Sequence, residues 1–259
     1  MSRVESVLEA LLSLERPLLV ALDVDGTLSP IVRNPDLAEI PEPIRSVLAA
    51  LAGTPTVELA LITGRDLGSL SRMEQLDGVW RAVEHGGVVL APGQTPTPSR
   101  PELTTEQREA LDRFRQWADT HARDAFIESK PQAVAVHVRG VASSDPDRAD
   151  QLLREADELA QSLGLHVRRG KALCEAEAVR HDKGSALREI FERSGAKSIF
   201  FAGDDLTDFP AIDFAAEHGV GAFVCSEEQR GTPSASAVLL RNVDEVSSLL
   251  SQLLQRIAE

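Results

Sequence analysis

Two aspartates, one residue apart, directly follow an apolar run near the start of the chain. The run LLVAL covers residues 18–22, and Asp23 and Asp25 come after it, followed by Gly26 and Thr27. Carboxylates at the end of a buried strand repel each other and resist the loss of water, so a positive group must compensate them. The candidates for that group are a lysine, a metal ion and a substrate.

Polar residues follow other predicted strands in the same way. Thr63, Gly64 and Arg65 end the run VELALI, and Lys183 lies at the start of a predicted helix. The segment GDDLTD, after the run SIFFA, supplies three more carboxylates, those of Asp204, Asp205 and Asp208. Ligands of open α/β sheets bind outside the carboxyl ends of the strands, so we expect these groups to converge.

These residue types suit phosphoryl transfer. Carboxylates from two strand ends form the kind of oxygen site that Mg2+ prefers. The Thr63 hydroxyl and the Lys183 ammonium can hold phosphate oxygens, and for Arg65 we favour a structural role. A remaining carboxylate can attack phosphorus and form an aspartyl-phosphate. A cation acting together with a lysine would explain why the strand ends on carboxylates.

The elements that would position these residues alternate between strands and helices. Up to residue 92, the pattern predicts helices over 3–15, 41–53 and 66–73 and strands over 18–22, 57–63, 79–85 and 88–92. From residue 182 on, it predicts helices over 182–194, 206–217 and 243–257 and strands over 198–203 and 221–225. This rhythm indicates a Rossmann-like α/β core, in which helices cover both faces of a parallel sheet.

A smaller α+β insertion interrupts the predicted core. The proline-rich segment 91–104 marks its start. Helices over 104–122 and 146–163 and strands over 133–140 and 165–170 follow, and the alternating strand favours an antiparallel sheet covered by helices on one face. We therefore assign residues 1–92 and 173–259 to the core and residues 93–172 to an inserted cap.

Composition restricts the partners that the protein can have. The formal net charge of −14 argues against nucleic acid and anionic membrane surfaces, because both demand a basic patch. No apolar run approaches the roughly 18–20 residues of a membrane helix, and the N-terminal segment lacks the features of a signal peptide. The two cysteines, Cys174 and Cys225, lack metal-ligand spacing. We expect a cytoplasmic protein, and the net charge does not exclude a small anionic substrate, which needs only a few cations in a pocket.

Four motifs, in this order and spacing, resemble those of the haloacid dehalogenase superfamily: DVDGT, the Thr63 of LITGR, Lys183 and GDDLTD. More narrowly, residues 22–41, LDVDGTLSPIVRNPDLAEIP, are similar to the opening segment of the trehalose-6-phosphate phosphatase family, and the resemblance extends over residues 16–250. It implies a hydrolase core with an inserted cap that confers specificity. It also implies Mg2+-dependent hydrolysis of trehalose 6-phosphate to trehalose and phosphate through an aspartyl-phosphate.

The resemblance implies a role for each residue of the motifs. Asp23 is the nucleophile, and Asp25 is the general acid that protonates the leaving sugar oxygen and then activates water. Thr63 and Lys183 bind the phosphoryl group, and Lys183 also screens the charge of Asp23. The Mg2+ site comprises Asp23, the main-chain carbonyl of Asp25 and Asp204, with Asp205 and Asp208 near or behind the metal.

The resemblance also implies residues that bind the sugar. The family cap carries a Glu-x-Lys pair, a downstream Arg and a Lys-x-x-x-Glu, which this sequence matches with Glu128, Lys130, Arg139, Lys171 and Glu175. In the core, His85 matches a His-Gly segment of the family. A functional link to a trehalose-phosphate synthase is implied as well, and a monomer is one possible oligomeric state.

Three positions depart from the family pattern. Val88 stands where an acid is expected, Val138 replaces an aromatic residue and Phe209 replaces a glutamate. These departures leave open the same mechanism on another sugar or glycoside phosphate. A second alternative is a catalytically retired domain that binds sugar phosphate as a regulator. Its signature would be the loss of a residue such as Asp23 or Lys183, and both are present.

Overall fold

The computed structural model describes residues 2–32, 37–95, 103–130, 132–170, 172–179, 181–225 and 237–258. The chain divides into two compact units, one formed by Met1–Thr97 with His181–Glu259 and the other by Pro98–Arg180. We call the first unit the core and the second the cap. Along the described ranges, no helix is both long enough and apolar enough to cross a membrane.

The core is built on a seven-stranded sheet with the strand order β11-β10-β9-β1-β2-β3-β4. These strands are β1 (Leu18–Leu22), β2 (Val57–Ile62), β3 (Val79–Val83), β4 (Val88–Leu90), β9 (Ser198–Gly203), β10 (Gly219–Val224) and β11 (Val238–Leu240). All neighbours pair in parallel except β3 and β4. The predicted α/β fold class is confirmed.

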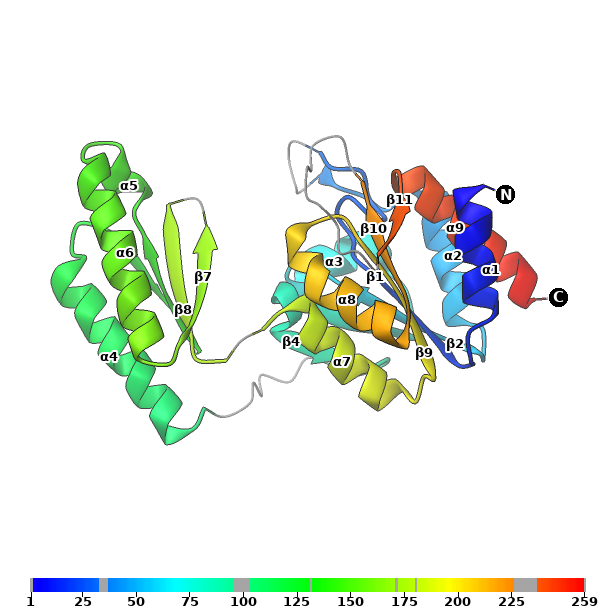
Figure 1. Ribbon diagram of the computed structural model, residues 1–259, viewed down its shortest axis with the longest axis horizontal. Coiled ribbons are helices and arrows are strands. Elements are labelled where there is room, and N and C mark those ends of the chain that lie inside the picture. The colour runs from blue at the N-terminus through cyan, green and yellow to red at the C-terminus, as the bar shows by residue number, and fades with distance from the viewer. Residues whose placement is uncertain are drawn as a thin grey trace. The chain divides into compact units, whose positions relative to one another are not determined.

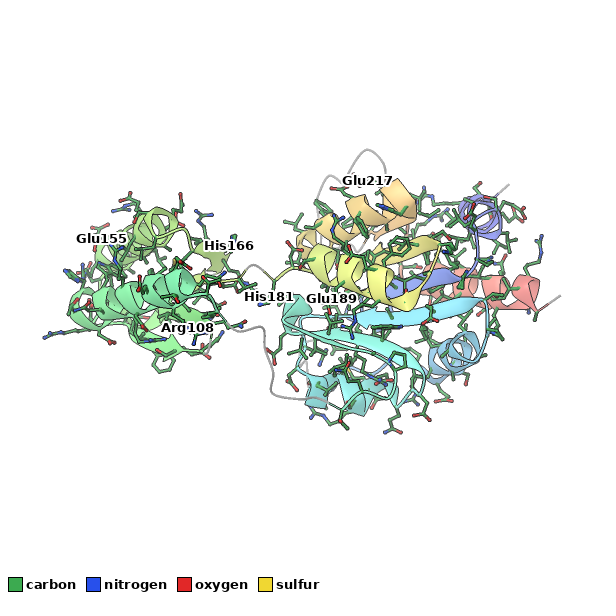
Figure 2. The ribbon with its side chains drawn as sticks, turned by 90° about the horizontal axis from the view of Figure 1, so that it is seen from below. Arg108, Glu155, His166, His181, Glu189 and Glu217 are labelled. Atoms are coloured by element: carbon green, nitrogen blue, oxygen red, sulfur yellow. The ribbon has the colours of Figure 1, made fainter. Side chains whose placement is uncertain are left out.

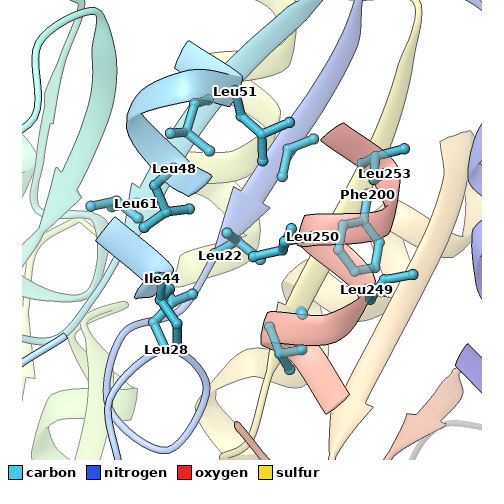
Figure 3. Packing of buried hydrophobic residues seen from close by; sticks show 14 of the residues in the cluster. Leu22, Leu28, Ile44, Leu48, Leu51, Leu61, Phe200, Leu249, Leu250 and Leu253 are labelled. Carbon is cyan, nitrogen blue, oxygen red and sulfur yellow. The ribbon is translucent and has the colours of Figure 1, made fainter. Parts of the chain in front are cut away.

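Helices cover both faces of this sheet (Figure 1). One face carries α1 (Arg3–Leu12), α2 (Glu42–Ala52), α3 (Leu67–Glu74) and α9 (Val243–Ile257), and the other carries α7 (Lys183–Ser194) and α8 (Phe209–His218). Figure 3 shows the cluster under the first group, where Leu22, Leu48 and Leu250 are fully buried. This packing holds β1 between β2 and β9, so the carboxyl ends of these three strands meet at one edge.

The cap is an antiparallel sheet with the strand order β5-β6-β8-β7. Its strands are β5 (Phe126–Ser129), β6 (Ala133–His137), β7 (His166–Gly170) and β8 (Leu173–Glu177), and its helices are α4 (Thr105–His121), α5 (Arg139–Ala142) and α6 (Pro146–Ser162). Apolar side chains of α4 and α6, such as Phe114 and Leu152, pack with Val134 and Val136 of the sheet. The outward faces of these helices carry polar residues such as Arg108 (Figure 2).

The boundary between cap and core lies later in the chain than the sequence indicated. We expected the core to resume at residue 173, but residues 173–177 form β8, which pairs with β6 and β7 of the cap. The core resumes at His181. The strands β5, β8 and β11 and the helix α5 were not predicted. The strand expected over 133–140 ends at His137, because Val138 caps α5.

Candidate active site

The loop that follows β1 is held in shape by its own residues. Val24 and Leu28 are fully buried, and the amides of Leu28 and Ser29 donate to the Val24 carbonyl at 2.9 and 2.8 Å. Gly26 has a φ of +82°, and a Cβ there would lie 2.0 Å from Asp204 Oδ2. Glycine is required at this position both by the left-handed backbone and by the close approach of the segment after β9.

Lys183 is the first residue of α7, and a capping box fixes this end of the helix. The Asp182 carboxylate accepts a hydrogen bond from the Ser185 amide at 2.7 Å, and the Asp182 amide donates to the Ser185 hydroxyl. Lys183 Nζ lies 2.7 Å from Asp23 Oδ1 and 2.7 Å from Asp208 Oδ1, and 4% of the lysine side chain is exposed. The lysine thus joins residues that follow β1 and β9.

Three buried carboxylates surround this lysine. Oxygen atoms of Asp23, Asp204 and Asp208 lie within 4.8 Å of one another. Asp208 Oδ2 accepts a hydrogen bond from the Asp205 amide at 2.9 Å. Gly203 leaves room for Asp208, since a Cβ on the glycine would lie 2.3 Å from the Asp208 Cγ. A set of hard oxygen ligands in this arrangement fits Mg2+.

Burial dominates the electrostatics of this cluster. It raises the pKa of Asp23 and of Asp208, although the Lys183 ammonium opposes both shifts. Burial also raises the pKa of Asp204 to about 7, and the Asp208 carboxylate adds to the shift. Burial alone would lower the pKa of Lys183, but its two carboxylate partners raise it above the usual value. Three carboxylates and one ammonium leave excess buried negative charge, which a divalent cation would compensate.

Asp25 pairs with a different residue from the one that Asp23 and Asp208 contact. The Arg65 guanidinium donates to both of its carboxylate oxygens at 2.6 Å, which makes a bidentate ion pair. The side chain of Asp25 is 40% exposed, against 12% for Arg65. The buried Thr63 hydroxyl accepts a hydrogen bond from the Arg65 amide at 3.2 Å. The segment after β2 is therefore tied to the segment after β1, and Asp25 stays accessible outside the three-carboxylate cluster.

The Asp205 carboxylate forms hydrogen bonds within its own segment. Its carboxylate accepts hydrogen bonds from the Leu206 amide at 2.6 Å and from the Thr207 hydroxyl at 3.2 Å. These contacts cap the short helix η3 (Leu206–Asp208). Of the five aspartates expected near the metal, the carboxylates of Asp23, Asp204 and Asp208 lie together, the Asp25 carboxylate pairs with Arg65 and the Asp205 carboxylate caps η3. The main-chain carbonyl of Asp25 stays the predicted ligand from the segment after β1.

His85 lies in a strained turn that packs against the segment after β2. Glu84, His85 and Gly86 have φ values of 53°, 56° and 93°, and such angles are costly for the two residues that carry a Cβ. The amide of His85 donates to the Thr63 carbonyl at 3.0 Å, and that of Glu84 donates to the Arg65 carbonyl at 2.9 Å. The turn therefore positions the Thr63 segment through its backbone.

The imidazole of His85 lies over a glycine of that segment. A Cβ on Gly64 would come within 2.5 Å of the His85 ring. Gly86 approaches α7 on the other side of the turn, since a Cβ there would lie 2.7 Å from the Asp182 carbonyl oxygen. The turn thus lies between the Thr63 segment and the helix that begins with Lys183.

A series of substitutions at His85 separates the backbone of this turn from its imidazole. His85→Val is expected to lower kcat and to destabilise the fold by about 1–2 kcal/mol, because a β-branched residue resists the left-handed conformation. His85→Asn tolerates that conformation and should lose much less of both. Phosphate-release kinetics and denaturant unfolding measure the two effects. Equal losses of kcat in both variants would contradict this and would assign the effect to the imidazole itself.

Three of the cap residues with an expected role lie together. Lys130 Nζ lies 2.5 Å from Glu175 Oε1 and 3.8 Å from Glu128 Oε2. Arg139 begins α5, and its side chain is exposed. Lys171 lies outside the described residues.

Two arginines belong to these groups although the sequence analysis gave neither a chemical role. Arg65 binds Asp25, and Arg168 lies 2.7 Å from Glu177 Oε1 and 3.9 Å from Glu175 Oε2. Arg65 follows the end of β2 by three residues and β2 neighbours β1, so the sequence indicated that Arg65 lies near the segment after β1, but not that it pairs with Asp25. For Arg168 the signal was its alternation with Val167, which places it on the face of β7 turned away from the helices.

A comparison with family models and with known proteins identifies relatives of this chain. The sequence profile of the family described as Trehalose-phosphatase matches residues 21–244. A trehalose-phosphate phosphatase of Mycobacterium marinum is 29% identical over 277 residues, which cover 100% of this chain and 68% of that protein. An uncharacterized glycosyl hydrolase of Mycobacterium tuberculosis is 35% identical over 265 residues, which cover 97% of this chain and 19% of that protein. This chain therefore spans about a fifth of the length of the second relative.

The fold is also found in a solved structure. Aspergillus fumigatus trehalose-6-phosphate phosphatase superposes with a TM-score of 0.77 over 99% of this chain and 98% of the fungal chain, at 23% sequence identity. At this level of identity the likeness shows the fold alone, an α/β core with an inserted unit.

Proposed function

Because this chain belongs to the trehalose-phosphatase family, we propose that it hydrolyses trehalose 6-phosphate to trehalose and phosphate, with bound Mg2+ and an aspartyl-phosphate intermediate. One observation carries the proposal. The buried Asp23 carboxylate contacts Lys183 at 2.7 Å, and its oxygen lies within 4.8 Å of carboxylate oxygens of Asp204 and Asp208. A nucleophile, an ammonium and ligands for a divalent cation thus meet at the end of one central strand.

The residues of the site divide the reaction between them. A carboxylate oxygen of Asp23 attacks phosphorus, and the bond from phosphorus to the sugar oxygen breaks. Asp25 gives a proton to that oxygen, which leaves as the sugar hydroxyl. Asp25 then takes a proton from water, whose oxygen attacks phosphorus and releases phosphate and the Asp23 carboxylate. Thr63 and Lys183 hold the phosphoryl oxygens throughout.

These reaction steps depend on the metal and on the ion pair between Asp25 and Arg65. Mg2+, held by the carboxylates of Asp23, Asp204 and Asp208, would offset the charge of the phosphoryl group. The Arg65 guanidinium engages both oxygens of the Asp25 carboxylate, so one of them must be released before it can exchange a proton with the substrate. We assign Arg65 the role of holding Asp25 until substrate enters.

We assign recognition of the sugar to residues of the cap. Glu128, Lys130 and Glu175 place carboxylates and an ammonium on one face of the cap sheet, and such groups suit sugar hydroxyls. Two of the departures from the family pattern lie in packed surroundings: Val138 is fully buried in the cap, and Phe209 packs on Phe223 in the core with ring centroids 5.5 Å apart. These two departures therefore do not argue for a different sugar.

A panel of sugar phosphates tests the proposal. Phosphate release at fixed Mg2+ would be compared for trehalose 6-phosphate, sucrose 6-phosphate, glucose 6-phosphate and a glucosylglycerol-type phosphate. We expect kcat/KM for trehalose 6-phosphate to exceed the others by at least about 100-fold, because a site built for particular hydroxyls rejects analogues that lack them. Faster turnover of another sugar would keep the mechanism and overturn the specificity. Retained binding of trehalose 6-phosphate with no turnover would favour the regulatory alternative.

A further inference from the structure

A chain of alternating charges crosses the open face of the cap sheet. The charged groups of Glu128, Lys130, Glu175, Arg168 and Glu177 alternate in sign, and the His137 imidazole contacts Glu128 at one end. Every strand of the cap sheet borders or contributes to this chain, which we call the charge chain. The helices α4 and α6 pack on the opposite face, against side chains such as Val134 and Cys174.

The strand register places the two central carboxylates across a small residue. Glu128 of β5 pairs with Ala135 of β6, which pairs with Glu175 of β8, which pairs with Arg168 of β7. The four residues therefore form one row across the sheet. The methyl group of Ala135 separates the two carboxylates, and Lys130 bridges them.

Arg168 holds the far side of the Glu175 carboxylate. Lys130 contacts Glu175 Oε1 at 2.5 Å, whereas Arg168 lies 3.9 Å from Oε2 and 2.7 Å from Glu177 Oε1. Glu175 and Glu177 are two residues apart on β8, so their carboxylates share a face and repel each other. A guanidinium placed between them offsets this repulsion and attracts the Glu175 carboxylate from the side opposite the lysine.

His137 holds the Glu128 carboxylate at the other end. Its Nε2 lies 3.1 Å from Glu128 Oε2, and its ring packs on Phe126 with centroids 5.5 Å apart. Each of the two carboxylates therefore has a partner of its own in addition to the shared lysine.

We infer that Arg168 and His137 are positioning residues that set the specificity of the sugar site by orienting Glu175 and Glu128. The inference rests on the proposed function, because it assumes that these two carboxylates accept hydrogen bonds from sugar hydroxyls. A carboxylate discriminates between sugars only if its lone pairs point in fixed directions, and the outer members of the charge chain provide that restraint.

The neighbouring arginine on the same strand provides a matched control. Arg169 faces the opposite side of β7 and pairs with Asp157 of α6 at 2.7 Å. Arg168→Gln and Arg169→Gln remove the same charge from adjacent positions. We expect Arg168→Gln to raise KM for trehalose 6-phosphate about tenfold with little change in kcat, as for the loss of one charge-assisted contact. We expect Arg169→Gln to leave both constants within about twofold of the wild type.

A double-mutant cycle shows whether Arg168 acts through Glu175. If it does, adding Arg168→Gln to Glu175→Gln raises KM no further, so the two effects are not additive. The same design applies to His137→Ala and Glu128→Gln. Independent, additive effects would overturn the inference, as would equal effects of Arg168→Gln and Arg169→Gln. Arg168→Lys keeps the positive charge but lacks the planar guanidinium, and it is expected to restore KM in part.

A substrate without a sugar separates this inference from the proposed function. Turnover of an aryl phosphate depends on the core residues alone, so it should be the same in Arg168→Gln as in the wild type. A fall in aryl phosphate turnover would indicate that the variant damages the fold and would count against a positioning role. If the wild type hydrolyses aryl phosphate but no trehalose 6-phosphate, the proposed function fails. If the wild type hydrolyses both and Arg168→Gln leaves sugar discrimination unchanged, the inference alone fails.

Discussion

Asp23→Asn is expected to abolish phosphate release from every substrate, with a loss of at least about 10^4-fold in kcat, because an amide cannot take the place of the attacking carboxylate. The substitution should not damage the fold. Lys183 keeps its second partner, Asp208, at 2.7 Å. Burial raises the pKa of Asp23, so ionising this carboxyl costs folding free energy that the neutral amide does not. We therefore expect the metal-free variant to be at least as stable as the wild type.

The measurement combines kinetics with unfolding. Phosphate release and denaturant unfolding would be recorded for the wild type, for Asp23→Asn and for Asp213→Asn, which removes an exposed carboxylate from α8 and should change neither property. Mass spectrometry of quenched turnover should find a phosphorylated Asp23 peptide in the wild type alone. Substantial turnover by Asp23→Asn would refute its role as the nucleophile, whatever the sugar.

Removal of divalent cations is expected to stop turnover, and the affinity for Mg2+ should fall steeply in acid. Burial raises the pKa of Asp204 to about 7 in the metal-free protein. A protonated carboxyl must lose its proton before it can bind metal, so below pH 7 the dissociation constant should rise about tenfold per pH unit for each such proton. Calorimetric titration of Mg2+ at pH 5.5, 6.5 and 8 measures this slope. A dissociation constant independent of pH would show that these carboxylates do not hold the metal.

The same pKa shift gives a stability effect with a defined sign. Between the ordinary pKa of an aspartate and about 7, the folded metal-free protein binds more protons at Asp204 than the unfolded chain does. Its stability therefore falls as pH rises through this window. Bound Mg2+ opposes the fall, so the increase in melting temperature on adding Mg2+ should be larger at pH 8 than at pH 5.5.

The sequence located the groups at the edge of the core sheet because each follows an apolar strand. Asp23, Thr63 and Asp204 occupy the same position relative to β1, β2 and β9, and the parallel pairing of these strands places their ends together. Local spacing therefore carried enough information to predict that they converge. The pairing of Asp25 with Arg65 joins residues 40 positions apart and depends on side-chain direction, which no local pattern reports.

The segment after β9 shows why the individual aspartates could not be separated from sequence. Asp205 and Asp208 both follow the strand within five residues, and both have the chemistry of a metal ligand. The turn of η3 gives them different contacts: Asp205 caps the helix, while Asp208 lies against Gly203 and contacts Lys183. This difference depends on the absence of a side chain at Gly203 and on the position of the lysine, which lies 25 residues away in the chain.

The cap sheet was harder to predict because its open face is charged. β8 reads LCEAE, and two glutamates in five residues resemble a solvated segment rather than a strand. The strand exists because Cys174 and Ala176 are buried on one face, while Lys130 and Arg168 neutralise the glutamates on the other. Such pairing is tertiary, so strand propensity alone misjudged it, and the cap boundary was drawn too early.

The cap is inserted within the sequence of the core, so during synthesis the cap is finished before the core. The cap occupies one continuous stretch, Pro98–Arg180, so all of its strands have been made before either Lys183 or β9 leaves the ribosome. The first half of the core, by contrast, must wait with one edge of β1 unpaired until residues 198–203 arrive. An apolar strand edge left open in this way is prone to association with other chains. The carboxylates of Asp23 and Asp204 meet only when β9 pairs with β1, so their repulsion opposes this pairing and not the earlier pairing of β1 with β2.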